Sequence, residues 1–80
     1  MIINDVKQLL RELCSVEEIK ENDSLTADLG MDSLGLVTLL LALEERFQIT
    51  FYESDMNPFE LTTVQDVIEL VKAYKGVNDD

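Results

Sequence analysis

An uncharged run of eleven residues, 33–43, follows directly behind Asp32 in a chain that holds 17 Asp and Glu residues. Either the whole run is buried in the core, or part of it faces a binding partner in place of solvent. At about 100° per residue, a helix over residues 33–47 gathers a set of large apolar side chains in one arc. We expect this arc to face the core: Leu36, Leu40, Leu43 and Phe47, with Leu39 at its edge.

The opposite arc of the same helix mixes apolar side chains with carboxylates: Leu34, Thr38, Leu41 and Glu45, flanked by Val37 and Glu44. Two interpretations stay open. Another helix packs on this arc, and Leu34 and Leu41 are then ordinary core residues. Alternatively, the arc is a docking surface, where acidic residues attract a basic partner and apolar residues are buried on contact. The geometry favours the docking surface.

The chain before this helix predicts one helix and one long loop. Apolar residues recur at helical spacing over residues 4–14, and Asn4 or Asp5 can cap the start of that helix. Residues 15–32 are mostly polar and contain Gly30, so we expect a loop that Leu25 and Leu29 anchor to the core.

The chain after this helix predicts a connector, a short helical turn and a final helix. The alternation of Phe47, Ile49 and Phe51 lacks a partner strand, which favours an extended connector. Asn57 as N-cap, with Pro58 at the first helical position, predicts a turn through residues 59–61. The final helix starts at the capping-box pair Thr62 and Gln65 and ends near Gly76, and residues 77–80 fray.

These elements predict an all-α fold, a small four-helix bundle. It has three longer helices and one short helix, with the long loop between the first two. At 80 residues the chain is near the smallest size that one apolar core stabilises, so we expect a single domain over residues 1–76.

Charge and composition exclude several classes of function. A net charge of -11 repels nucleic acid and anionic membranes and attracts proteins with basic patches. The chain has no histidine, the commonest general base and transition-metal ligand, so we expect no catalytic residue and no metal site. With a single cysteine, Cys14, and no signal peptide or membrane span, the sequence predicts a soluble, cytoplasmic monomer.

Ser33 follows Asp32 at the start of the uncharged helix. The simplest role for Ser33 is that of an N-cap. A hydrolytic role is not expected because no histidine can activate the hydroxyl group. A phosphate esterified to Ser33 would instead lie at the positive end of the helix dipole, near free N–H groups. Ser33 therefore suits covalent modification better than catalysis.

The sequence DLGMDSL, residues 28–34, resembles the acyl carrier protein and peptidyl carrier protein family. Val37, Leu39, residues 42–45 and Phe47 continue the resemblance through the same helix. The stretches 23–25, in the first loop, and 62–64, at the start of the last helix, also resemble the family at the corresponding positions. The resemblance therefore extends over residues 3–75.

The resemblance implies that Ser33, between Asp32 and Leu34, carries 4'-phosphopantetheine covalently. A phosphopantetheinyl transferase would attach this group from coenzyme A, and its thiol would hold an acyl or aminoacyl thioester. The chain itself would be no enzyme. Activating enzymes and condensing or transfer enzymes with basic patches would recognise the outward arc: Leu34, Val37, Thr38, Leu41, Glu44 and Glu45.

Two departures from the family bear on the pathway. Gly35 and Thr38 are neutral where fatty-acid carriers usually have acidic residues, and the segment after Phe47 looks longer. Both features favour a specialised carrier in polyketide, nonribosomal peptide or aminoacyl-transfer chemistry. A housekeeping fatty-acid carrier and a non-carrier acidic adaptor, which binds basic partners through the same helix, remain the alternatives.

Overall fold

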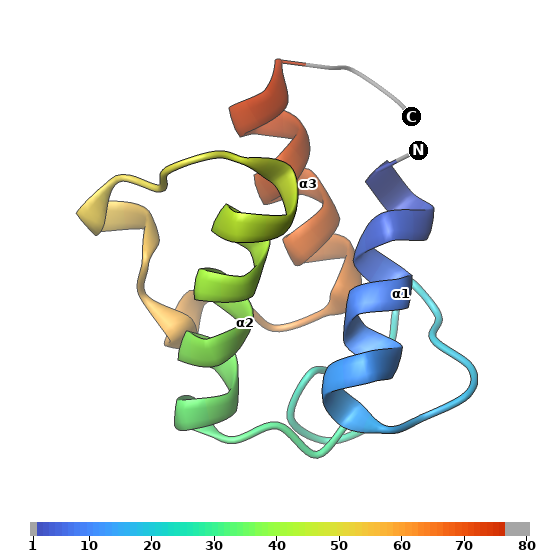
Figure 1. Cartoon of the computed structure of the whole chain (residues 1–80). Helices are drawn as coiled ribbons and strands as arrows, with labels where there is room; N and C mark the ends of the chain where they lie inside the picture. Colours follow the sequence, from blue (N-terminus) through green and yellow to red (C-terminus); the bar gives the residue numbers. More distant parts are fainter. Residues whose placement is uncertain (1, 77–80) are drawn as a thin grey trace.

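The computed structural model describes residues 2–76 and contains three α-helices (Figure 1). These are α1, Ile2–Cys14, α2, Ser33–Phe47, and α3, Val64–Lys75. Two single turns of 3-10 helix, η1 at Glu53–Asp55 and η2 at Pro58–Glu60, lie between α2 and α3. The all-α prediction is confirmed, but the expected short fourth helix corresponds to these two turns. The expected frayed tail, residues 77–80, lies outside the described residues.

α1 begins at Ile2, earlier than the sequence predicted. Asn4 and Asp5 are therefore inside the helix, and the prediction that either caps it was wrong. Asp5 lies in the first turn, where the helix dipole stabilises a carboxylate. At the other end Ser15 takes a left-handed conformation with φ 56°, and its N–H bonds to Arg11 O at 2.9 Å.

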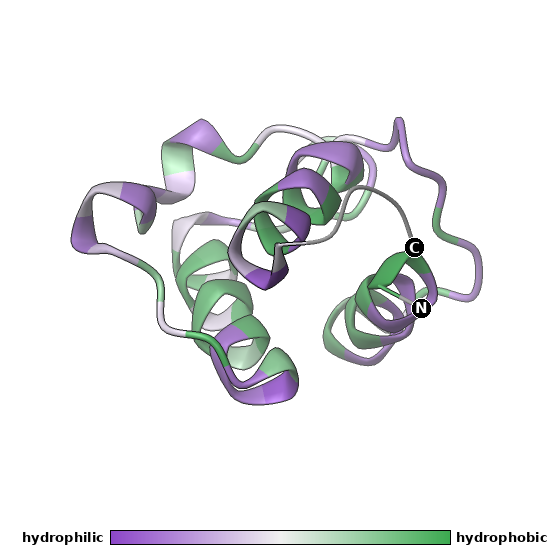
Figure 2. Ribbon diagram, turned by 90° about the horizontal axis from the view of Figure 1, so that it is seen from above, coloured by the Kyte–Doolittle hydropathy of each residue, from purple (hydrophilic) through white to green (hydrophobic). Residues whose placement is uncertain are grey.

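The three helices surround one apolar core. Its fully buried side chains come from every helix and from the long loop, and the largest of them are Leu10, Leu25, Leu39, Leu40, Leu43 and Ile68. On α2 the whole predicted core face is buried, Leu36, Leu39, Leu40, Leu43 and Phe47. In Figure 2, α2 is green along most of its length, and purple is confined to its C-terminal end.

The long loop, residues 15–32, is attached to the start of α3. Leu25 is fully buried, as predicted, and its N–H bonds to Thr62 O at 2.9 Å. The carbonyl groups of Asp23 and Glu21 accept from Val64 N–H at 3.0 Å and Gln65 N–H at 2.8 Å. These two N–H groups have no acceptor within the helix, so carbonyl groups of the loop serve as their hydrogen-bond acceptors.

The capping box of α3 lies one residue further along than predicted. Thr63 is the N-cap, and its hydroxyl oxygen accepts from Asp66 N–H at 3.3 Å. Asp66 Oδ2 in turn accepts from Thr63 N–H at 3.1 Å and from Thr62 N–H at 3.0 Å. The predicted pair of Thr62 and Gln65 was wrong because the carboxylate of Asp66 reaches both amides. Gly76 ends the helix at φ 73°, as predicted.

The connector between α2 and α3 lies on the side of α2 that is remote from α1 (Figures 1 and 2). Phe51 is buried and stacks edge-on against Tyr74 of α3, with ring centroids 4.8 Å apart. The Tyr74 hydroxyl accepts from Tyr52 N–H at 2.9 Å and donates to the Asp55 carboxylate. At η2, Asn57 Oδ1 accepts from Phe59 N–H at 3.0 Å, which confirms Asn57 as N-cap.

Candidate functional site

The start of α2 has Asp32 as its N-cap. Asp32 is extended, with φ -103° and ψ -175°, and its Oδ1 accepts from Gly35 N–H at 2.8 Å. Ser33 is the first residue inside the helix, and its side chain is exposed. The simplest prediction, Ser33 as N-cap, was therefore wrong. Since Asp32 makes the cap, the hydroxyl group of Ser33 is not needed to satisfy the helix end.

The loop before α2 fixes Asp32 through a compact turn. Asp28 Oδ2 accepts from Ser24 N–H at 2.6 Å, and Met31 N–H bonds back to Leu25 O at 2.9 Å. Gly30 has φ 74°, a left-handed conformation that glycine adopts without a steric cost. Since Leu25 is in the core, this turn holds the start of α2 against the body of the protein.

The outward arc of α2 is exposed to solvent. Leu34 is 73% exposed, Leu41 53% and Val37 37%. The interpretation that another helix packs on this arc is wrong, because the described residues leave these side chains uncovered. Thr38 and Glu45 are also exposed, as expected for a docking surface. We call Leu34, Val37, Thr38, Leu41, Glu44 and Glu45 the outer face of α2.

Glu44 differs from the rest of the outer face. It is half-buried, and its Oε2 accepts from Phe51 N–H at 2.8 Å. Glu44 therefore fixes the beginning of the connector to α2 while adding negative charge to the outer face. Its neighbour Glu45 is exposed.

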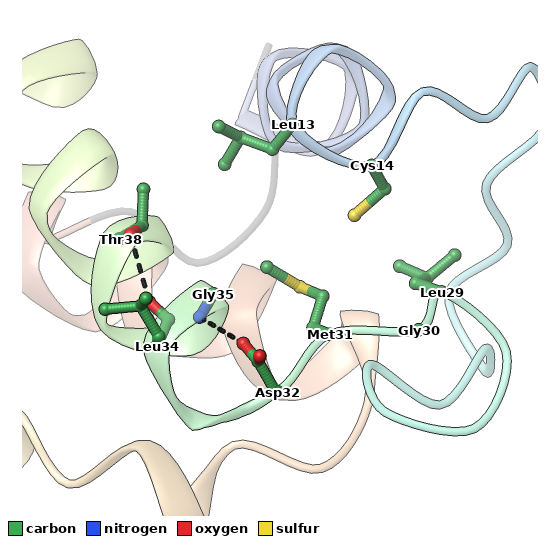
Figure 3. Close-up of a pocket in the computed structure, with 9 residues that line it drawn as sticks. All are labelled: Leu13, Cys14, Leu29, Gly30, Met31, Asp32, Leu34, Gly35 and Thr38. Atoms are coloured by element: carbon green, nitrogen blue, oxygen red, sulfur yellow. Dashed lines mark hydrogen bonds between the residues drawn. The ribbon is translucent and has the colours of Figure 1, made fainter.

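A hollow of about 420 Å³ lies between the start of α2 and the C-terminal end of α1 (Figure 3). Leu13 from α1 and Met31 from the loop extend into it. Asp32, the N-cap of α2, and Leu34 and Thr38 on α2 border it. The sequence analysis did not predict this hollow, because residues from three separate segments form it.

Cys14 also lines the hollow, and its sulfur points toward Met31 (Figure 3). Burial raises the pKa of the Cys14 thiol, since the charged thiolate loses solvation there. The thiol is therefore protonated at neutral pH. Within residues 2–76, no group of three or more acidic or cysteine side chains is arranged to hold a metal ion.

The family model for the phosphopantetheine attachment site matches residues 4–71 of this chain. The chain belongs to this family. The match covers most of α1, the long loop, α2, the connector and most of α3.

Curated relatives share most of the length of this family member. It is 37% identical over 76 residues to an acyl carrier protein of Wolinella succinogenes, covering 92% of this chain and 97% of that protein. It is 40% identical over 75 residues to an acyl carrier protein of Chlamydia caviae, covering 91% and 95%. An acyl carrier protein of Campylobacter lari is 37% identical over 73 residues, covering 89% and 92%.

Membership decides between the carrier and the non-carrier adaptor in favour of the carrier. The chain is an acyl carrier protein whose cofactor is phosphopantetheine, and such proteins are carriers and not catalysts. The family's partners are a phosphopantetheinyl transferase and acyl-handling enzymes. Among the described helices, none is long and apolar enough to cross a bilayer.

Proposed function

We propose that Ser33 is the residue that carries phosphopantetheine. The observation that supports this assignment is the division of roles at the start of α2. Asp32 makes the cap hydrogen bond, and Ser33, one residue later, presents an exposed hydroxyl group at the positive end of a 15-residue helix. A phosphate ester at this position would be close to the first N–H groups of α2.

The attachment is a phosphoryl transfer. Ser33 Oγ attacks the phosphorus atom that bears the pantetheine in coenzyme A. The new P–O bond forms as the bond between the two phosphates breaks, and the nucleotide leaves with that oxygen. A base of the transferase takes the hydroxyl proton, because this chain has no histidine to do so. The thiol at the end of the attached arm supplies the thioester chemistry.

The test is the intact mass of the protein after incubation with coenzyme A and a broad-specificity phosphopantetheinyl transferase. We expect the mass to increase by one phosphopantetheine group. Ser33→Ala should prevent the increase. Ser54→Ala, which changes an exposed serine of η1, should leave it intact. A Ser33→Ala variant that is still loaded would refute the assignment.

The outer face of α2 is the surface that we propose partner enzymes recognise. Its exposed leucines can be buried in an apolar groove of the enzyme, and the acidic residues of the chain attract basic residues around that groove. A net charge of -11 opposes association between two copies, which supports a monomer. The single cysteine supports a reducing compartment such as the cytoplasm. Because one apolar core joins all three helices, we also propose a single carrier domain over residues 1–76.

For the pathway, we propose a specialised carrier in polyketide, nonribosomal peptide or aminoacyl-transfer chemistry. The first turn of α2 contains no acidic residue, and the half-buried Gly35 and the exposed Thr38 add no charge to its first two turns. A basic enzyme that requires carboxylates at these positions would bind this carrier slowly. The second candidate is a housekeeping fatty-acid carrier, and the name of the relatives, acyl carrier protein, fits either candidate.

Thr38→Glu distinguishes these two pathways. Thr38 is exposed, and its side chain bonds only within α2, to Leu34 O at 2.9 Å, so the change preserves the fold. We expect the variant to be used faster than the natural chain by a fatty-acid elongation enzyme, and more so at low salt. A natural chain that already works as well as a fatty-acid carrier would support the housekeeping role.

Gly35 is a poorer position for the same experiment. A Cβ atom at Gly35 would lie 3.3 Å from Asp32 Oδ1, the oxygen that caps α2. Gly35→Asp would therefore disturb the cap as well as add charge, and its two effects could not be separated.

A further inference from the structure

A second hollow lies between the connector and the C-terminal half of α3. Its volume is about 470 Å³, and we call it the tyrosine hollow, lined by Thr50, Phe51, Tyr52, Asp55, Ala73 and Tyr74. Lys75 Nζ donates to Phe47 O at 3.3 Å, so the C-terminal ends of α3 and α2 lie side by side (Figure 1). Because α2 has 15 residues, its two ends are about 20 Å apart. The tyrosine hollow is therefore remote from the start of α2, and it shares no residue with the outer face of α2.

Tyr74 holds the lining of the tyrosine hollow together. Its ring centroid lies 4.8 Å from that of the buried Phe51 and 5.8 Å from that of Tyr52. Its hydroxyl group accepts from Tyr52 N–H at 2.9 Å and donates to the Asp55 carboxylate. The rings and the carboxylate are thus positioned before a ligand arrives, which lowers the entropy cost of binding one.

The tyrosine hollow combines an open aromatic ring with a carboxylate. Tyr52 is 74% exposed, so a ligand can reach its ring, and the face of an aromatic ring attracts cations. Asp55 is exposed as well. Tyr74 occupies one of about four acceptor positions that a carboxylate offers. A cation that stacks on Tyr52 can therefore also donate hydrogen bonds to Asp55.

Among cationic side chains, arginine matches this combination best. Its guanidinium group is planar, stacks on aromatic rings and loses water more easily than an ammonium group does. Its N–H groups also bind a carboxylate in pairs. Lysine presents a strongly hydrated point charge, which neither stacks nor forms paired hydrogen bonds.

We propose that the tyrosine hollow binds an arginine side chain on the surface of a partner protein. The net charge of -11 attracts a basic surface, and the exposed Glu53 lies in the same turn as Asp55. Lys75 follows Tyr74 in the chain, but its ammonium group bonds to the end of α2.

The shape of the tyrosine hollow favours a protein over a free small molecule. Four of its six lining residues are exposed, Thr50, Tyr52, Asp55 and Ala73. A pocket for a free ligand surrounds most of that ligand's surface, whereas an open hollow accepts one side chain that another surface presents. A second copy of this chain is a poor partner, because it has the same charge of -11.

The position of the tyrosine hollow separates it from the outer face of α2. A protein bound at the connector leaves Leu34 and Leu41 uncovered, because these side chains are exposed on α2 and do not line the tyrosine hollow. One protein can then hold this chain while another contacts the outer face.

Binding is tested with acetyl-Gly-Arg-Gly-amide as the probe and acetyl-Gly-Lys-Gly-amide, of the same charge, as its control. The chain has two tyrosines and no tryptophan, and both tyrosines line the hollow. Tyrosine fluorescence therefore reports on this site. We expect the arginine probe to change the emission saturably and with a lower Kd than the lysine probe.

Nuclear magnetic resonance shows where the probe binds on the natural chain. Protons beneath an aromatic ring are shielded, so the δ-methylene protons of the arginine probe should move upfield. The backbone amide signals of Tyr52, Asp55 and Tyr74 should shift with the probe concentration, and those of Leu34 and Leu41 should not.

A matched pair of variants tests the ring. Tyr52→Leu should raise the Kd of the arginine probe at least about threefold, the size of a cation–π contact at an exposed site. Phe59→Leu removes another exposed aromatic ring, one that does not line the tyrosine hollow, and should leave the Kd unchanged. Asp55→Asn keeps an acceptor for the Tyr74 hydroxyl group and should weaken both the binding and its dependence on salt.

Four results would overturn the inference. Equal binding of the two probes, unaffected by Tyr52→Leu, would show attraction by the net charge alone. Equal weakening by Tyr52→Leu and Phe59→Leu would show general adhesion to exposed rings. Amide shifts at Leu34 and Leu41 would place the probe on the outer face of α2. An arginine probe that changes neither the emission nor the shifts would show that the tyrosine hollow does not bind a guanidinium group.

Discussion

Asp32 and Ser33 are adjacent polar residues with different environments. The side chain of Asp32 bonds to Gly35 N–H at 2.8 Å, while Ser33 is exposed at the first helical position. This difference matters because an ester bond to a capping serine would remove the cap. With Asp32 as the cap, modification of Ser33 leaves the helix end satisfied.

At the same scale, Asp32→Ala should lower the free energy of unfolding by about 0.5–2 kcal/mol, the usual cost of losing an N-cap. Asp32→Asn should cost much less, because an Asn side chain caps about as well. Urea denaturation of both variants measures this difference. Equal losses in the two variants would mean that the charge of Asp32 matters and the cap does not.

Tyr74 gives a pH dependence at the alkaline end. Loss of solvation and the hydrogen bond to the Asp55 carboxylate raise the pKa of Tyr74, although the hydrogen bond from Tyr52 N–H acts in the opposite direction. In the unfolded chain Tyr74 loses its proton first. The stability that it contributes is therefore complete below the ordinary tyrosine pKa of about 10 and is lost as pH rises through the folded value.

Tyrosinate absorbance during an alkaline titration checks this order. The folded protein should show a component that titrates later than in the urea-unfolded chain, and Tyr74→Phe should remove it. If Tyr74→Phe leaves the late component in place, another group is its source.

At the scale of the element, α2 has a core face and an outer face with opposite requirements. Leu36 is 3% exposed and Leu40 is fully buried, so replacing either by Ala removes buried methyl groups and leaves a cavity. We expect each of these changes to cost about 2–5 kcal/mol of unfolding free energy. Chemical denaturation measures it.

The outer face provides the matched controls for this prediction. Leu34→Ala and Leu41→Ala should cost much less stability, since these side chains are 73% and 53% exposed. They should instead weaken transfer of the acyl group to a partner enzyme. If all four variants were equally destabilised, the outer face would be part of a packed interface after all.

At the scale of the whole molecule, charge repulsion opposes folding. A net charge of -11 is distributed over a bundle with principal extents of 28 × 25 × 19 Å. The described ion pairs offset little of this repulsion. The shorter pair joins Lys7 Nζ and Glu21 Oε2 at 3.0 Å. The hydrogen bond and charge of Lys7 lower the pKa of Glu21. Excess like charge makes the compact state less stable than an uncharged bundle of this size.

Added salt should therefore raise the melting temperature, because the Debye length falls from about 30 Å at 0.01 M to about 8 Å at 0.15 M ionic strength. Divalent cations should act in the same direction. Thermal denaturation followed by circular dichroism over this range measures the effect. A melting temperature that does not change with ionic strength would contradict the prediction.

The amino-acid sequence by itself determined the class of fold and the extent of α2. Apolar spacing identified its core face, and all five predicted core residues of the helix are buried. Local chemistry also identified the Asn57–Pro58 turn and the glycine end of α3. These features depend on residues close together in the chain, whose periodicity and backbone preferences can be derived without knowing the fold.

Tertiary structure decided which of two suitable residues performs a role. Asp32 and Ser33 are both good N-caps, and so are Thr62 and Thr63, so the choice in each case came from how the loop positions the chain. From the sequence, Glu44 was predicted only to flank the outward arc of α2. In the structure, its carboxylate also accepts a hydrogen bond from Phe51 N–H of the connector. The hollow likewise needs Leu13 and Met31 side by side, a contact between separate segments that depends on how the whole chain packs.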